Sequence, residues 1–123
     1  MNTPLEIQSL AKLLLAKLRA GRNSGDVTPI HPITGKQIVA DYFLRYQSEI
    51  CDVNVREAVH CLRVNGEPIG SNADGYYYCT SEHEWDETRS RLLGRIKNQR
   101  AAADAPSLRF AQENNLNLLE SEK

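Results

Sequence analysis

Two histidines and two cysteines are the residues of this sequence best suited to hold a metal ion. They are His60, Cys61, Cys79 and His83. Zn²⁺ takes four such ligands, and the spacing Cys79-x3-His83 is close to usable. However, His60 and Cys61 are neighbours in a predicted helix, so their side chains point about 100° apart. No CxxC pair is present. We therefore predict neither a metal site nor another cofactor.

The pattern of acids and nucleophiles gives little support to catalysis. Four acids gather where a helix is predicted to begin, and there they favour the helix dipole and cap. They are Glu82, Glu84, Asp86 and Glu87. The stretch NGEPIG lacks the Lys-Ser/Thr of a phosphate-binding loop. Nothing in the sequence orients a Cys79–His83 pair for nucleophilic attack. We therefore predict a protein that is not an enzyme.

Basic side chains recur along one flank of a predicted helix that begins with Asp52 as its N-cap. At 100° per residue, Arg56, His60 and Arg63 share this flank. The core-facing positions follow the spacing i, i+3, i+4, i+7, and they are Val55, Ala58, Val59 and Leu62. The remaining outer positions are Asn54, Glu57 and Cys61. This helix therefore has one face for a core and one polar face for a partner.

A β-hairpin is predicted directly after this helix, which ends in a left-handed turn at Asn65-Gly66. We expect a strand at 68–71, a turn with the sequence Asn-Ala-Asp-Gly, and a return strand at 76–79. Period two places Tyr77 and Cys79 on one face of the return strand. The hairpin is thus short and lies next to the basic flank in the chain.

The N-terminal helix is expected to begin at a capping box, Thr3 to Glu6, and to end near Gly21. Its narrow apolar stripe consists of Leu10, Leu14 and Leu18. Such a stripe needs a partner surface, because an isolated amphipathic helix is not stable. We expect dimerisation through this helix, or an added core helix, rather than membrane contact. Docking of a protein partner is a third interpretation.

Two further capping boxes, at 34–37 and 81–84, predict two more helices. The first continues to Tyr46. The second has the inner stripe Trp85, Thr88, Leu92 and Ile96, and the sequence Asp104-Ala105-Pro106 is expected to stop it. Between Thr88 and Arg100 this helix carries five basic residues and no acid. Its basic residues point in several directions, so phosphate contact and a solvated face are both open interpretations.

Length and charge limit the class of protein. A chain of 123 residues with 41% hydrophobic residues suffices for one core. The net charge of −1 means that any nucleic-acid surface is a local patch. No apolar run reaches the length of a membrane span, and the first residues lack the order of a signal peptide. Three cysteines without a CxxC favour a reducing compartment. We expect a cytoplasmic protein.

The order of helix, short link, helix, hairpin and helix resembles the layout of winged helix-turn-helix proteins. Residues from about 31 to 105 resemble small winged-helix proteins encoded in bacteriophage genomes. The stretches that carry the resemblance are ITGKQIV, VREAVHCLRVNGEPIGSNADGYYY and SRLLGRI. One departure is that only QSEIC lies between Tyr46 and Asp52, so the middle helix is very short or absent.

The resemblance implies double-stranded DNA as the partner, inside a bacterial host cell. The implied recognition-helix contacts are Asn54, Arg56, Glu57, His60 and Arg63, and the implied wing contacts are Ser71, Asn72 and Tyr76. Arginine can pair with guanine and asparagine with adenine, whereas Ser and Asn at a wing bind phosphates. The group consists of transcription regulators and accessory replication proteins.

We therefore expect a mostly α protein with a small β-hairpin, organised as a winged helix-turn-helix with an additional N-terminal helix. The expected parts are the N-terminal helix (1–21), a linker (22–33), the winged-helix domain (34–104) and a C-terminal tail (105–123). The leading hypothesis is a DNA-binding protein in transcription control or replication. The alternative is a protein-interaction module that uses this scaffold to bind or inhibit a host protein.

Overall fold

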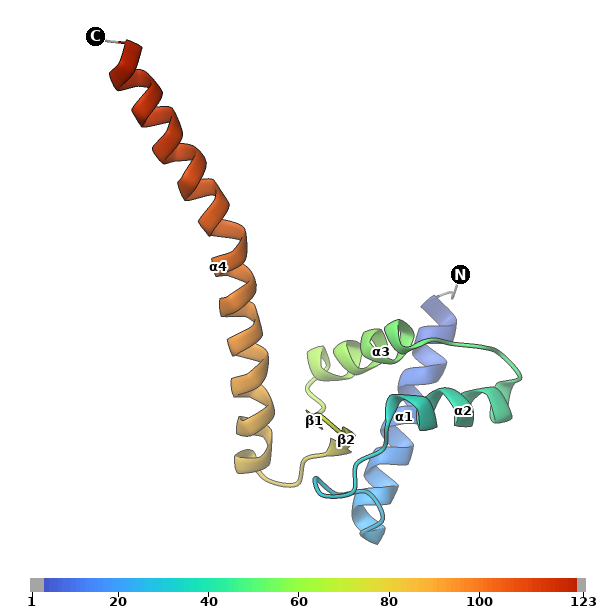
Figure 1. The fold of residues 1–123 in the computed structure, drawn as a ribbon. Helices are drawn as coiled ribbons and strands as arrows, with labels where there is room; N and C mark the ends of the chain where they lie inside the picture. Colours follow the sequence, from blue (N-terminus) through green and yellow to red (C-terminus); the bar gives the residue numbers. More distant parts are fainter. Residues whose placement is uncertain (1–3, 122–123) are drawn as a thin grey trace. The chain divides into compact units, whose positions relative to one another are not determined.

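The computed structural model describes the backbone of residues 4–121 and the side chains of residues 5–113. Its elements, in chain order, are α1 (Pro4–Ser24), α2 (Gly35–Tyr46), α3 (Asp52–Val64), β1 (Ile69–Asn72), β2 (Gly75–Tyr78) and α4 (Glu82–Ser121) (Figure 1). A mostly helical chain with one small hairpin was predicted, and this coarse prediction is confirmed. Tertiary contacts divide the chain between Thr88 and Arg89 into an N-terminal unit and a C-terminal unit.

Helix α1 lies in the core of the N-terminal unit. Leu10, Leu14 and Leu18 are 0%, 1% and 0% exposed, and α1 packs against α3, β2 and α2. The leucine stripe is thus covered within the same chain, which agrees with the expected added core helix and not with the expected dimer interface. The helix runs three residues past the predicted end at Gly21. The predicted cap at Thr3 lies outside the described residues.

Helices α2 and α3 form a pair across which α1 runs (Figure 1). The predicted capping box starts α2: the Gln37 amide donates to the Thr34 hydroxyl (3.2 Å), and the Gln37 side chain accepts from the Thr34 amide (2.9 Å). Gln47 ends α2 in the left-handed conformation, with φ of 53°. Residues 47–51 contain no helix and lead directly into α3. No middle helix therefore separates the pair.

The N-cap of α3 is Cys51 rather than Asp52, which corrects the prediction. Asn54 Oδ1 accepts hydrogen bonds from the Cys51 amide (2.9 Å) and from Cys51 Sγ (3.1 Å). These two bonds to the side chain at the third helical position hold Cys51 as the N-cap, and Asp52 is the first residue of the helix. The predicted core stripe of α3 is confirmed, because Val55, Ala58, Val59 and Leu62 are all buried.

The antiparallel hairpin pairs Ile69 with Tyr78 and Asn72 with Gly75. Both strands are shifted by one residue from their predicted bounds. Tyr77 and Cys79 are buried, as period two predicts. An isolated bridge adds a third segment, because Ile33 and Tyr76 exchange two backbone hydrogen bonds of 2.9 and 2.8 Å. The segment before α2 is thereby tied to the hairpin.

Helix α4 does not stop at residues 104–106, as expected, but continues to Ser121 with Pro106 inside it. Proline removes one backbone hydrogen bond, yet the alanine-rich sequence before it strongly favours helix. The predicted inner stripe holds only at its start. Thr88 is 1% exposed and Trp85 packs against the core, whereas Ile96 is 59% exposed. Ile96 therefore has no core role, which corrects that part of the prediction.

Candidate nucleic-acid interface

Helix α3 presents a polar face opposite its buried stripe. Arg56, Glu57 and His60 are all exposed on this face. The stripe of four apolar residues fixes the rotation of α3 about its axis, so these three side chains must point away from α1 and α2. Two of them can carry positive charge and one is an acid. The arrangement can offer hydrogen bonds to the edges of bases in a major groove.

Arg63 is placed differently from Arg56, although both are on the predicted flank. Its Nε donates to the Ile69 carbonyl oxygen at 2.9 Å, and its Nη2 donates to the Ser71 hydroxyl at 3.1 Å. The guanidinium also lies 6.0 Å from the centre of the Trp85 ring. Arg63 and Ser71 thus join α3 to β1 inside the protein, and the structure uses their polar groups for that purpose.

Asn72 holds the hairpin turn. Its Oδ1 accepts from the amides of Asp74 (2.9 Å) and Gly75 (3.1 Å), while its Nδ2 donates to the Pro29 carbonyl oxygen at 2.9 Å. Tyr76 is half-buried and packs against the core. The exposed tip is left to Ala73 and the acid Asp74. Of the predicted wing contacts, therefore, both Ser71 and Asn72 have partners within the chain.

Asn54 is also engaged, because its carbonyl oxygen caps α3 through Cys51. Of the eight predicted contacts, four thus make side-chain hydrogen bonds within the protein: Asn54, Arg63, Ser71 and Asn72. Periodicity identifies which face a residue occupies, but it cannot reveal a bond to a strand six or eight residues away. The structure brings the remaining candidates of α3 together on one exposed face.

A partly buried ion pair that the sequence did not indicate joins α1 to the start of α4. Arg22 donates to Glu84 at 2.7 Å and to the Thr80 hydroxyl at 3.1 Å. Burial opposes ionisation of Glu84, but hydrogen bonds from the Thr80 amide and from Arg22 hold the pKa of this carboxyl below its ordinary value. Arg22 was assigned to a loop, and no local pattern signals a partner 62 residues away.

The predicted capping box at 81–84 forms only in half. The Glu84 amide donates to the Ser81 hydroxyl at 3.2 Å, but the Glu84 carboxylate accepts from the Thr80 amide, at 2.9 Å, rather than from Ser81. The ion pair with Arg22 holds the carboxylate in that position. The acid at this position therefore links two helices in addition to capping one.

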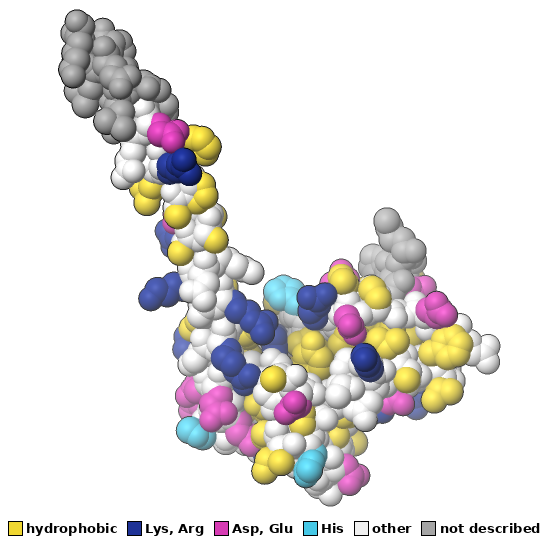
Figure 2. All heavy atoms as spheres, viewed as in Figure 1, with side chains coloured by type: hydrophobic (Ala, Val, Ile, Leu, Met, Phe, Trp, Pro, Cys, Tyr) yellow, Lys and Arg dark blue, Asp and Glu magenta, His cyan; other side chains and the backbone are white. Residues whose placement is uncertain are grey.

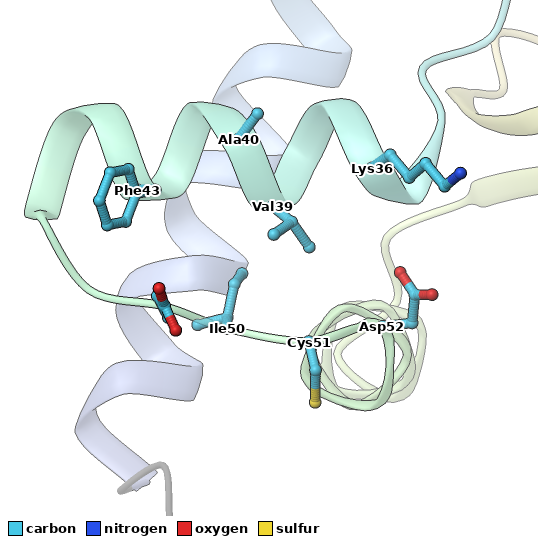
Figure 3. A pocket seen from close by; sticks show the side chains of 8 residues that line it. Lys36, Val39, Ala40, Phe43, Ile50, Cys51 and Asp52 are labelled. Carbon is cyan, nitrogen blue, oxygen red and sulfur yellow. The ribbon is translucent and has the colours of Figure 1, made fainter.

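A groove of about 550 Å³ lies between α2, the linking residues and the start of α3 (Figure 3). Its walls are mainly apolar, with Val39 and Ile50 facing each other across it. Lys36 and Asp52 lie at one end and Phe43 at the other (Figure 3). Such a groove accepts an apolar side chain more readily than a charged ligand. No sequence motif indicated it.

The C-terminal unit carries the strongest concentration of positive charge. The stretch from Arg89 to Arg100 has five basic residues and no acid, and all five are exposed. Figure 2 shows Lys and Arg side chains gathered along the part of α4 that follows its acidic start. Residues 1–88 contain 8 Lys/Arg and 12 Asp/Glu, whereas residues 89–123 contain 7 and 4. The near-neutral total therefore conceals two regions of opposite net charge.

Within the described residues, no group of three or more His, Cys, Asp or Glu side chains could hold a metal ion. Cys51 and Cys61 are exposed thiols, and Cys79 is buried. Burial raises the pKa of the Cys79 thiol to about 11, so it stays protonated and unreactive at neutral pH. None of the helices between residues 4 and 121 has both the length and the apolar character that a membrane crossing requires.

Comparison with protein-family models, with curated proteins and with solved structures finds no match to this chain. Function is therefore inferred from the geometry of α3 and the hairpin and from the charge of α4.

Proposed function

We propose that the N-terminal unit is a winged helix-turn-helix domain that binds duplex DNA, with α3 as its recognition helix. The observation that carries the proposal is the placement of Arg56 and His60. Both are exposed on the face of α3 that lies opposite its buried stripe, and a hairpin follows the helix. A helix fits the major groove, and its outward side chains reach base edges there.

The order of elements supports the same proposal. Helices α2 and α3 are joined by five residues, and α1 packs across them. The hairpin gains a third segment through the Ile33–Tyr76 bridge. Three helices followed by such a hairpin are typical of winged helix-turn-helix domains. In this arrangement α1 is a core helix of the domain rather than an addition to it.

The internal bonds divide the predicted contacts by role. Arg56 and His60 are the side chains we assign to base edges, and Glu57 is suited to accept from a cytosine amino group. Arg63 and Ser71 are positioning residues, because they hold the hairpin beside α3. A role in transcription control or as an accessory factor in replication fits such a domain.

The test is selection of bound duplexes from a random-sequence pool, followed by anisotropy on the enriched site. Arg56→Ala should weaken binding to that site by about 1–3 kcal/mol and relax the base preference at one position. Arg45→Ala is the matched control, because Arg45 is also exposed but lies at the end of α2. Failure to bind any duplex at about 50 mM salt, where phosphate contacts are strongest, would overturn the proposal.

The groove of Figure 3 favours a second candidate function, that of a protein-interaction module. Phe43, which lines the groove, is 47% exposed, and Tyr46 and Val53, which are near it in sequence, are 47% and 50% exposed. An acidic N-terminal unit with exposed apolar residues is also compatible with a protein partner. Phe43→Ala should leave DNA binding unchanged if α3 is the functional surface. If Phe43→Ala abolishes the protein's effect in the cell while DNA binding stays unchanged, the protein-interaction function is favoured.

A further inference from the structure

The basic segment of α4, from Arg89 to Arg100, has cations but almost no counter-charges. Of its five basic residues only Arg100 forms an ion pair among the described residues, with Asp104 at 3.7 Å, and both partners are largely exposed. No acid occurs between Thr88 and Asp104. Like charges this close in sequence repel one another and weaken the helix. A polyanion would remove that repulsion.

The cations of this segment form two rows. At 100° per residue, Arg89, Lys97 and Arg100 fall within about 80° of one another, and Arg91 and Arg95 within about 40°. The two rows lie on opposite sides of the helix, about 180° apart. A helix about 10–12 Å wide fits a major groove about 12 Å wide, and phosphates then line both of its sides. Two opposed rows match that geometry better than one row would.

Small residues occupy the face between the two rows. They are Ser90, Gly94 and Ala101. Gly94 is informative because glycine is a poor residue for the interior of a helix. A Cβ added at Gly94 would meet no atom within 4 Å, so packing within the protein does not require glycine there. A missing side chain permits close approach of the backbone to a ligand.

We propose that the segment Arg89–Arg100 is a second DNA-binding element, which lies in a major groove with its small face inward and its two basic rows against the phosphates. This inference rests on the proposed DNA-binding function and names an additional element for it. The segment supplies affinity without sequence preference, because phosphates carry no base information. Because the segment and the N-terminal unit belong to one chain, binding of either to DNA raises the effective concentration of the other near the same duplex, and the two contacts reinforce each other.

The test uses the full chain and a mixed-sequence duplex of about 30 base pairs, with anisotropy measured across a series of NaCl concentrations. The logarithm of the binding constant falls linearly with the logarithm of the NaCl concentration, and each phosphate contact adds roughly one unit to the steepness of that line. Arg91→Gln/Arg95→Gln and Arg89→Gln/Lys97→Gln should each reduce that slope by about 2. The control Lys12→Gln/Arg45→Gln removes the same charge from exposed positions of α1 and α2 and should leave the slope nearly unchanged.

A second variant tests the inward face without changing charge. Gly94→Gln favours the helix more than glycine does, so circular dichroism should show equal or greater helicity. We expect it nevertheless to weaken DNA binding about tenfold, because the new side chain keeps the helix out of the groove. Wild-type affinity in Gly94→Gln would overturn the groove geometry.

The outcomes separate this inference from the proposed function. An unchanged salt slope in both double variants of the basic segment, together with an altered base preference in Arg56→Ala, would overturn the second element and leave the recognition helix in place. No binding of any duplex at about 50 mM salt would overturn both. Charge-dependent binding to phosphatidylserine vesicles without DNA binding would assign the basic segment to a membrane surface and would also overturn the inference.

Discussion

Two arginines of the N-terminal unit hold elements together, whereas the arginines at the start of the C-terminal unit do not. In the N-terminal unit, Arg22 donates to Glu84 and Thr80, and Arg63 donates to the Ile69 carbonyl and to Ser71. In the C-terminal unit, Arg91 and its neighbours are exposed on a helix with almost no acids around them. Arg22 and Arg63 thus link separate elements, whereas Arg89, Arg91 and Arg95 are exposed and form no ion pair among the described residues.

This difference shows that residue type alone does not identify a binding surface. Arg56 and Arg63 are seven residues apart on one helix, yet one is exposed and the other joins α3 to the hairpin. The difference comes from β1, where the Ile69 carbonyl and the Ser71 hydroxyl accept hydrogen bonds from Arg63. A contact map is therefore needed before a basic flank is assigned to DNA.

Amide hydrogen exchange should give the largest contrast between the two units. Amides of α1 around Leu14 exchange only when the core opens, whereas those of α4 after Arg89 require only local fraying of a single helix. We expect protection factors that differ by on the order of 10³ or more. Mass spectrometry of peptides from the two segments would measure this, and equal protection would contradict the division into units.

Replacing a leucine by alanine should lower the free energy of unfolding much more in the N-terminal unit than in the C-terminal unit. Leu14 is 1% exposed and Leu108 is 65% exposed. Leu14→Ala should lower the free energy of unfolding by about 2–5 kcal/mol, because it leaves a cavity in the core. Leu108→Ala should change it by less than about 0.5 kcal/mol. Urea denaturation followed by the fluorescence of the single tryptophan, Trp85, measures both.

Arg63→Ala should lower the free energy of unfolding by about 1–3 kcal/mol, because it leaves the Ile69 carbonyl and the Ser71 hydroxyl without their donor. Arg56→Ala should leave the free energy of unfolding nearly unchanged, because Arg56 is exposed. The same urea titration compares the two variants. Equal loss of stability in both would show that the difference between the two arginines has been misassigned.

The smallest expected effect is the pH dependence of the stability that the Glu84 carboxylate contributes. Its pKa is lowered in the folded state, so the stabilisation is complete above the ordinary pKa of glutamate and is lost as pH falls through the lower folded value. Glu84→Gln should therefore reduce stability by about 1 kcal/mol at neutral pH and have less effect in acid. Thermal unfolding of both proteins between about pH 3 and pH 7 would test this. A difference that does not depend on pH would show that the ionised carboxylate is not what stabilises the fold.

Much of the fold was predictable from sequence because local signals were strong. The capping box at Thr34 and the stripe of α3 both gave the correct elements. The length of α4 was not predictable, since proline usually ends a helix and here it does not. The roles of Asn72 and Arg63 depended on acceptors from other segments, which no periodic pattern reveals. The exposure of Arg56, Glu57 and His60 could be predicted from periodicity, and the internal bonds of Arg63 and Asn72 could not.

The turn at Gly75 limits how this sequence can vary. Its φ is 154°, and an added Cβ would lie 2.2 Å from the carbonyl oxygen of Ile33. The backbone angle and the nearby Ile33 segment both exclude a side chain, so only glycine is tolerated at this position. The two residues before it, Ala73 and Asp74, are exposed and can diversify freely. A laboratory that wished to graft a new peptide onto this scaffold could insert it at those two positions and would have to keep the glycine after it.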